Sequence, residues 1–473
     1  MMTEEKLYYT KVVSENGNEY VRLNDSHTIF TSEILKSPKR IKYLEKLNLL
    51  KESRFFEDEK IDEEIIRRKI YESALQQLTL EVTTACNFRC KYCVFGGNYK
   101  LMRSHETKNM DWTTAKKAID LYFKLFSEAE EYNYTRKPMV TFYGGEPLIN
   151  FTLIKDCILY IEQQYTNYDV HYSLTTNGTL LTDEVIDFLY LHNVNAVVSL
   201  DGPKEEHNRN RVYSNGKGTF DDVYINIIKL SKKFRRPVFT ICVYDIRSDI
   251  EKISTFYDNT SAVICLNTTP VKSFGSDYYT QFTEKEKIDF NEKEKKMKYY
   301  FMNNIAGDNS KVLNFLDRYF IDRCATFFCS FVDTHSVNGK ITKCTNPCIP
   351  GQKIFVSVEG RIYVCEKVSQ SYSIGNVEEG LNYKKIVNLV KQYCESIVGC
   401  KVCEIRNECG VCNMIIENDN GFNVDKAVCE SIYNTRKKQF KLALDICEKD
   451  PIWTKMAIAL YYKSMEEEVK NLL

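Results

Sequence analysis

The stretch at residues 83–97, TTACNFRCKYCVFGG, brings Cys86, Cys90 and Cys93 together within eight positions. Structural zinc sites and iron–sulfur clusters usually take four protein ligands. Three thiolates on one loop can instead hold three irons of a [4Fe–4S] cube and leave the fourth iron open to a ligand. An open metal position is typical of a catalytic site. The triplet therefore predicts a metal site built for chemistry.

The composition of the chain sets the limits within which this site must work. The 473 residues are 43% hydrophobic and 27% charged, which is typical of soluble globular proteins of two or three domains. Lys+Arg and Asp+Glu balance at 65 each, which argues against a nucleic-acid or anionic-membrane binder. No apolar run approaches the roughly eighteen residues that span a bilayer. The N-terminus MMTEEKLYYT lacks a signal-peptide pattern, so we expect a cytoplasmic protein.

The eighteen cysteines favour metal binding over disulfides, because cytosolic thiols are kept reduced. Their uneven spacing supports the same interpretation. For the cysteines at 157, 242, 265, 394 and 447, which lie in apolar helix- or strand-like settings, we expect buried side chains without metal.

From residue 78 to about 300, short apolar strands alternate with amphipathic helical stretches such as WTTAKKAIDLYFKLF. This alternation predicts right-handed crossovers and a parallel sheet. We expect an α/β fold, a partial (β/α)6 barrel over residues 76–305, with functional residues at the carboxyl ends of its strands. The predicted strands are LTLEVT, MVTFYGG, VHYSLTTNG, AVVSLD, PVFTICVYD and AVICLN.

Four motifs fall at these strand ends, and their coincidence is stronger evidence than any one of them. The cysteine triplet follows the first strand, YGGEP ends the second, TTNG the third and SLDGP the fourth. Two glycines allow close backbone approach, and a carboxylate beside them suits an amino group. The alternative to a binding role for GGE is an ordinary turn with a surface glutamate. For the polar residues of TTNG and SLDG, the alternative is that they make turns or cap strands.

The triplet resembles the signature CxxxCxφC of the radical S-adenosylmethionine (SAM) superfamily, in which φ is aromatic. Cys86, Cys90, Tyr92 and Cys93 match it at every position. The resemblance implies a reduced cluster that cleaves SAM to a 5′-deoxyadenosyl radical, which abstracts a substrate hydrogen. It also implies further SAM-binding residues: Gly144, Gly145 and Glu146 at the methionine amino group, Thr176, Asn177, Ser199 and Asp201 near the ribose and carboxylate, and Arg211 as a partner of the methionine carboxylate.

A second cysteine pattern occupies the C-terminal third of the chain. Cys344, Cys348 and Cys365 precede the run CKVCEIRNECGVC, which holds Cys400, Cys403, Cys409 and Cys412, and Cys429 follows. A zinc ribbon needs some fifteen or more residues between its CxxC pairs; here five separate them. The order resembles the SPASM extension of peptide-modifying radical enzymes, although two residues rather than the usual three separate the last clustered pair.

This resemblance implies two auxiliary [4Fe–4S] clusters, and so three clusters in all, within residues 344–432. One would be held by Cys344, Cys348, Cys365 and Cys412, the other by Cys400, Cys403, Cys409 and Cys429. Cys324 or Cys329 could replace Cys344, or that iron could stay open for a substrate thiol. Residues 306–343 bridge the barrel to this domain, and residues 433–473 are expected to be packing helices.

Glu366 directly follows Cys365, where related enzymes place an acidic residue near the substrate. By resemblance it would be a catalytic proton acceptor, and burial near clusters could adjust its pKa to that role. The alternative is a solvated residue whose partner is Lys367.

Residues 1–75 begin with two β-rich runs, LYYTKVV and EYVRL, joined by an Asn-Gly turn and followed by helical patterns. A small packing domain is one interpretation. The region also resembles a reduced leader-peptide recognition domain, which captures an extended peptide by strand addition.

The resemblance over residues 78–432 thus implies a radical maturase acting on a ribosomally made precursor peptide, with a crosslink such as a cysteine thioether as its product. Its partners would be that peptide and a reductant such as flavodoxin or ferredoxin. The first alternative is an anaerobic sulfatase-maturating enzyme that forms formylglycine. A non-catalytic iron–sulfur or zinc protein for electron transfer or regulation is the remote alternative.

Overall fold

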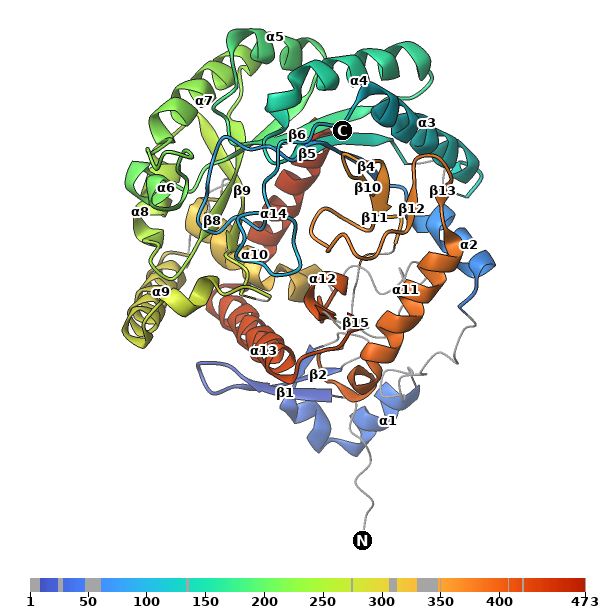
Figure 1. The fold of residues 1–473 in the computed structure, drawn as a ribbon. Helices are drawn as coiled ribbons and strands as arrows, with labels where there is room; N and C mark the ends of the chain where they lie inside the picture. Colours follow the sequence, from blue (N-terminus) through green and yellow to red (C-terminus); the bar gives the residue numbers. More distant parts are fainter. Residues whose placement is uncertain are drawn as a thin grey trace.

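Six parallel strands, each leading into a helix or loop at its carboxyl end, form the central sheet of the computed structural model (Figure 1). The structure describes residues 9–23, 29–46, 61–132, 136–273, 275–305, 313–329, 348, 350–406, 408–418 and 421–472. The six strands are β4 (Gln77–Thr83), β5 (Met139–Gly144), β6 (His171–Thr176), β7 (Asn195–Ser199), β8 (Val238–Tyr244) and β9 (Val263–Pro270). They coincide with the six predicted strands, and the partial-barrel prediction is confirmed.

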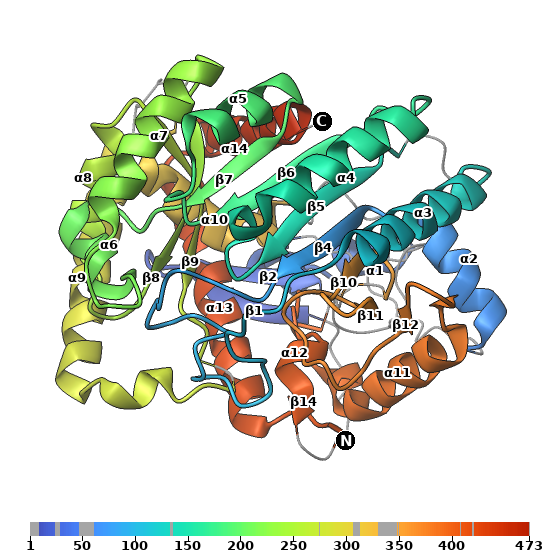
Figure 2. The same ribbon diagram turned by 45° about the horizontal axis from the view of Figure 1, so that its top comes forward.

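Helices cover the outer face of these strands (Figure 2). They are α3 (Trp112–Ala129), α4 (Phe151–Gln164), α5 (Asp183–Leu191), α6 (Lys204–Asn210), α7 (Phe220–Phe234) and α8 (Ile250–Asp258). Helix α9 (Glu284–Asn304) follows, and α10 (Phe315–Cys329) packs against α13 (Lys426–Lys449) and α14 (Pro451–Leu472). Side chains that cap free N–H groups mark where several of them begin: Asp111 accepts from the backbone of Thr114, and Thr182 from that of Val185. Short 3-10 turns lie at η2 (Pro147–Asn150) and η3 (Tyr278–Gln281).

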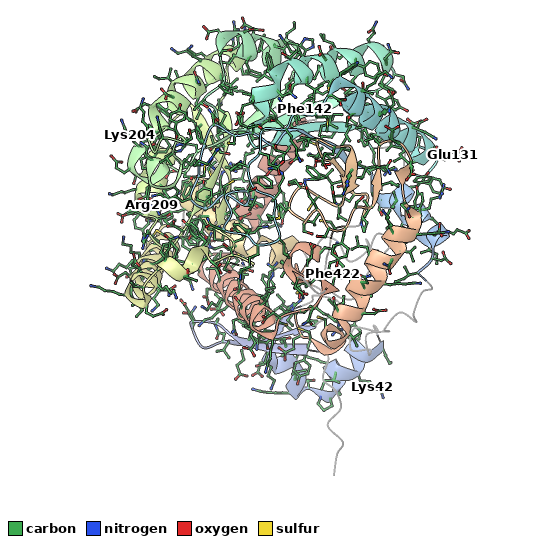
Figure 3. The ribbon with its side chains drawn as sticks, viewed as in Figure 1. Lys42, Glu131, Phe142, Lys204, Arg209 and Phe422 are labelled. Atoms are coloured by element: carbon green, nitrogen blue, oxygen red, sulfur yellow. The ribbon has the colours of Figure 1, made fainter. Side chains whose placement is uncertain are left out.

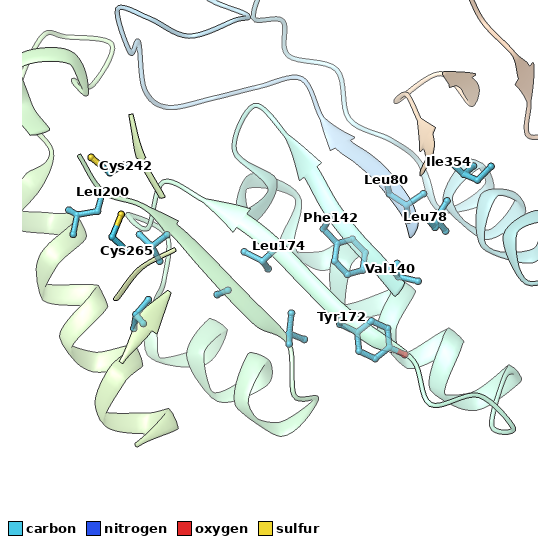
Figure 4. Packing of buried hydrophobic residues seen from close by; sticks show 14 of the residues in the cluster. Leu78, Leu80, Val140, Phe142, Tyr172, Leu174, Leu200, Cys242, Cys265 and Ile354 are labelled. Carbon is cyan, nitrogen blue, oxygen red and sulfur yellow. The ribbon is translucent and has the colours of Figure 1, made fainter. Parts of the chain in front are cut away.

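The strands are held by an apolar core that continues from strand to strand (Figure 4). Leu78, Phe142 and Leu174 are almost fully buried, as expected of parallel strands covered on both faces. Cys242 and Cys265 lie in the same core, where they act as small apolar side chains.

The C-terminal region extends the barrel sheet, which the sequence pattern did not predict. Strand β10 (Lys353–Val356) pairs in parallel with β4, and the antiparallel strands β11 (Arg361–Tyr363), β12 (Gly375–Asn376) and β13 (Gly380–Leu381) continue from it. The result is one sheet of ten strands in the order β13-β12-β11-β10-β4-β5-β6-β7-β8-β9. Cys365 therefore lies just beyond a strand that belongs to the same sheet as the Cys86 loop.

The rest of the C-terminal region comprises α11 (Tyr383–Ser396), η5 (Val398–Val402), α12 (Asn413–Ile416), the hairpin of β14 (Glu417–Asn418) and β15 (Gly421–Phe422), and the helices α13 and α14. Helix α14 and the later part of α13 pack on the main core, whereas residues between Tyr393 and Tyr433 form a second, smaller apolar cluster. Ile405, Cys409 and Val411 are buried in this cluster. Figure 3 places Phe422 on this side of the molecule and Phe142 on the barrel side.

The N-terminal residues form a three-stranded antiparallel sheet of β1 (Tyr9–Val13), β2 (Glu19–Leu23) and β3 (Ile29–Thr31). Gly17 takes a positive φ of 81° in the predicted turn between the first two strands. The turn η1 (Ser32–Lys36) and the helices α1 (Pro38–Lys46) and α2 (Glu63–Ser73) follow. Among the described residues, no helix is both long and apolar enough to cross a membrane.

Candidate active site

Cys86, Cys90 and Cys93 lie in the loop that follows β4, at the carboxyl end of the barrel. Burial raises the pKa of the Cys86 and Cys90 thiols to about 12, and the charges of the neighbouring cysteines contribute. Arg211 opposes this rise at Cys90 and Cys93, because its positive charge favours the thiolate. The three thiols are thus partly buried on one loop, with Arg211 close enough to act on two of them.

The glycines of the GGE motif are required by the backbone beside them. A Cβ on Gly144 would collide with the carbonyl oxygen of Thr83, and one on Gly145 with that of Ala85. Gly144 also takes a φ of 154°. Because the Gly145 N–H donates to Thr83 and the Glu146 N–H to Ala85, at 3.0 and 2.8 Å, the motif joins the end of β5 to the cysteine loop. Both glycines are thus required for close approach of the protein backbone, and their place at the amino group of SAM stays a prediction.

Glu146 is buried, with 1% of its surface exposed, and it accepts three hydrogen bonds. The Thr176 hydroxyl and the Asn177 backbone N–H donate to it at 2.7 Å, and the Leu148 N–H at 3.2 Å. Burial raises its pKa to about 7, against this opposition from its donors and from Arg211. A carboxylate has about four acceptor positions, so one remains for a further donor.

Tyr92, Asp201 and Arg211 form a buried group against the cysteine loop. The Tyr92 hydroxyl and the Arg211 Nε both donate to Asp201 Oδ2, the latter at 2.9 Å, and Oδ1 accepts from the Val243 N–H at 3.0 Å. The Arg211 guanidinium lies 5.5 Å from the centroid of the Tyr92 ring. Both oxygens of Asp201 therefore accept hydrogen bonds from protein groups, and its place near the ribose and carboxylate of SAM stays a prediction.

The residues at this strand end fit the group that the sequence implies. The two terminal nitrogens of Arg211 make no hydrogen bond with any described residue, so they can serve a carboxylate. Glu146 keeps one acceptor position for an amino group. Asn177 is held in place by Asn87 at 2.7 Å, and Ser199 is buried at the end of β7. Three thiols, a carboxylate and a guanidinium thus converge as an iron cluster and an amino acid require.

Four further residues lie close to Cys93 or to one another beside it, and the sequence pattern had not singled them out. His105 lies with its Nε2 3.6 Å from the Cys93 sulfur. Arg103 lies 3.8 Å over the ring of Phe95, and its Nε donates to the buried Glu81 at 2.6 Å. Phe95 in turn meets Tyr143 edge to face, with 6.5 Å between centroids. Tyr143 directly precedes the GGE motif, and that position was the available signal.

Glu366 is partly buried, with 11% of its side chain exposed, and it forms an ion pair with Lys353, which the sequence did not suggest. The Lys353 Nζ donates to it at 2.9 Å from strand β10. Burial alone would raise the pKa of this carboxyl, but the charges of Lys353 and Lys367 hold it below its ordinary value. Burial raises the pKa of Tyr143, and the negative charge of Glu366 adds to this rise.

The described C-terminal cysteines fall into two sets, and within each set one cysteine affects the pKa of the others. Cys348 and Cys365 each have a thiol pKa raised by burial and further by the charge of Cys412. The thiol pKa values of Cys403 and Cys409 are raised by burial and further by the charge of Cys429. Cys400 packs with Cys403 against the second apolar cluster. The assignment of these cysteines to two auxiliary clusters stays a prediction.

The ligand that completes the first set is not among the described side chains. Cys344 and the side chain of Cys329 lie outside the described residues. Cys324 is fully buried inside α10, where its thiol donates to the Phe320 carbonyl at 3.1 Å and lies near Cys447. The structure therefore does not place Cys324 with either set.

Among the described residues, no three His, Cys, Asp or Glu side chains are gathered tightly enough to hold one metal ion. A [4Fe–4S] cube binds each thiolate through a different iron, so its cysteines stand farther apart than the ligands of a single ion.

Comparison with known proteins points to one superfamily. Residues 80–257 match the radical SAM superfamily. The chain is 23% identical to the radical SAM cyclopropyl synthase TigE of Paramaledivibacter caminithermalis over 376 residues, 75% of this chain and 72% of the relative. It is 30% identical to a cysteine-type anaerobic sulfatase-maturating enzyme of Clostridium novyi over 187 residues, 39% of this chain and 48% of that enzyme.

The fold is also found among solved structures. Native anSMEcpe with bound AdoMet and Cp18Cys peptide superposes with a TM-score of 0.56 at 20% identity, covering 80% of this chain and 99% of that chain. At this identity the likeness establishes the shared fold.

Proposed function

Because the chain is an enzyme of the radical SAM superfamily, we propose that it oxidatively modifies a peptide or protein substrate with the help of two auxiliary clusters. The observation that carries this proposal is the grouping of the described cysteines into three sets, one on the barrel rim and two in the C-terminal region. When bound, SAM and its reduced cluster supply the radical that takes a substrate hydrogen atom, and the auxiliary clusters accept the electron left on the product.

The protein's own residues have defined tasks in this proposal. Cys86, Cys90 and Cys93 hold the open cluster, Glu146 accepts from the amino group of SAM, and Arg211 binds its carboxylate. Glu366, ionised beside Lys353, accepts the proton that leaves the substrate as it is oxidised. The rings of Phe95 and Tyr143 exclude water from the space between the barrel rim and Glu366.

The first candidate reaction is a crosslink in a ribosomally made precursor peptide, such as a cysteine thioether. The N-terminal sheet supports it, because β3 is an edge strand to which an extended leader peptide could add. The match to TigE, which extends over most of this chain, also favours a peptide-modifying reaction. A reductant such as flavodoxin or ferredoxin and a cytoplasmic location are part of the proposal.

The second candidate is conversion of a sulfatase cysteine or serine to formylglycine. The similarity to the sulfatase-maturating enzyme of Clostridium novyi supports it. The two reactions share the hydrogen abstraction and the removal of a second electron, and they differ in the fate of the oxidised carbon.

The discriminating experiment uses anaerobically reconstituted, reduced protein with two probes. One is the short cysteine-containing peptide encoded nearest to its gene, and the other is a peptide carrying the cysteine or serine segment of a sulfatase. A crosslinked product lacks two hydrogens and does not react with a hydrazine reagent, whereas formylglycine is captured as a hydrazone. If 5′-deoxyadenosine forms neither with the two probes nor with SAM alone, the proposed chemistry is wrong.

A further inference from the structure

A buried ion pair joins the N-terminal sheet to the loop that carries the second C-terminal cysteine set. Arg22 lies on β2, the central strand of the N-terminal sheet, and its guanidinium pairs with the carboxylate of Glu408. Each of these residues has 2% of its surface exposed. Glu408 lies between Cys403 and Cys409 and directly precedes the latter. A charge pair at this depth fixes both backbones, because neither group can be left alone away from water.

Arg22 is held from the sides as well as at its end. Its guanidinium lies 5.9 Å from the ring centroid of Phe327 on α10 and 5.6 Å from that of Phe440 on α13. Cations over aromatic faces are attracted by the ring quadrupole, and the attraction is stronger where water is excluded. The position of the guanidinium is therefore set by α10 and α13 as well as by the N-terminal sheet.

Hydrogen bonds join the β1–β2 hairpin to the C-terminal end of α13. Glu448 accepts hydrogen bonds from Asn16, Asn18 and Tyr20 at 2.8, 3.0 and 2.6 Å. Asp445 accepts from the Glu15 backbone N–H at 2.9 Å. Since α13 also carries Cys429 near its beginning, one helix connects the hairpin to the second cysteine set.

The cysteine loop itself is fixed from three elements. The Tyr433 hydroxyl of α13 donates to Glu404 at 2.8 Å, and the Tyr393 hydroxyl of α11 donates to the Val411 carbonyl at 2.7 Å. Arg22 of β2 supplies the third attachment, through Glu408. It is the attachment nearest in sequence to Cys409.

We propose that Arg22 is a positioning residue of the second auxiliary site, so that the N-terminal sheet is a structural part of that site in addition to any role in peptide recognition. The inference rests on the proposed function, because it assumes that Cys400, Cys403, Cys409 and Cys429 hold a cluster. The R22M change removes the guanidinium that pairs with the buried Glu408, and the loop must move to bring this carboxylate closer to water. The sulfur of Cys409 moves with the loop, and the cluster loses a ligand or changes its environment.

The test compares R22M, E408Q and the double variant R22M/E408Q with the wild-type chain after anaerobic reconstitution. K36M is the matched control, because Lys36 forms an exposed pair with Glu33 in the same N-terminal region. Iron and sulfide are counted per chain, and the reduced proteins are compared by electron paramagnetic resonance. C403A supplies the reference spectrum for loss of the second auxiliary cluster.

We expect about twelve irons in the wild-type and K36M proteins and about eight in R22M, with the spectrum of R22M matching that of C403A. The double variant should recover iron relative to R22M, since it no longer buries the carboxylate that Arg22 balances in the wild-type protein. R22M could also lose iron from all three sites, and the double variant R22M/E408Q then decides. If the double variant holds at least the SAM-binding cluster and the first auxiliary cluster, the inference is supported; if it too has lost iron from all three sites, the inference is wrong. An R22M protein with about twelve irons and the wild-type spectrum also overturns it. About four irons in the wild-type protein would instead remove the auxiliary sites from the proposed function.

Discussion

Replacing Glu146 with glutamine removes a carboxyl group whose pKa is raised by burial. We expect SAM binding by the variant to lose the pH dependence that comes from ionisation of this group. Burial raises the Glu146 pKa from 4.5 to about 7, despite the donors Thr176, Asn177 and Leu148. The folded protein therefore binds a proton here over a pH range in which the unfolded chain has released it. Stability of the wild-type protein falls as pH rises between these values, by about 3 kcal/mol in total, and then levels off.

The magnitude for binding follows from the same pKa. Only the ionised carboxylate offers the remaining acceptor position, and its fraction rises about tenfold between pH 6 and pH 8 for a pKa near 7. We therefore expect the ratio of wild-type to E146Q affinity for SAM to rise about tenfold over this interval. Taking the ratio cancels the titration of SAM itself. E146Q should also bind more weakly throughout, because its amide N–H₂ opposes the Asn177 N–H and leaves that donor unpaired.

The assay is equilibrium dialysis of labelled SAM with anaerobically reconstituted protein at several pH values. E184Q is the control, because Glu184 is an exposed acidic residue of the same barrel. Its SAM affinity and pH dependence should equal those of the wild-type protein. A wild-type to E146Q ratio that stays flat from pH 6 to pH 8 would refute the assignment of Glu146 to the amino group.

Three further substitutions test the neighbouring features. G145A places a Cβ against a backbone carbonyl of the cysteine loop, so we expect it to unfold about 3 kcal/mol more easily in denaturant, whereas G399A, with open space around it, changes little; equal midpoints would contradict this. D201N replaces the carboxylate that Arg211 contacts at 2.9 Å, and SAM affinity should fall at least tenfold with iron content unchanged, so an unaltered affinity would exclude Asp201 from positioning the guanidinium. E366Q should leave 5′-deoxyadenosine formation intact but lower product per SAM cleaved by about a hundredfold, and undiminished product would remove Glu366 as the proton acceptor.

Local sequence patterns were sufficient for the elements that chemistry and periodicity specify. The spacing of Cys86, Cys90 and Cys93 predicted an open-site metal loop, and alternating apolar runs predicted all six barrel strands. The strand-end positions of Gly145 and Glu146 were equally visible. Each of these signals is written in consecutive residues, because strand length, helix period and loop ligation depend on near neighbours.

Tertiary structure decided what pairs across the chain. It brought β10 beside β4 and so placed Glu366 next to Lys353, a partner that its own segment CEKVSQ does not indicate. It also brought Asp201 to Arg211, from the end of β7 and the end of α6. Most of all, it joined Arg22 to Glu408, which the sequence separates by most of the chain. Such pairings arise from burial of charge in a shared interior, and no spacing rule records which distant residues will share it.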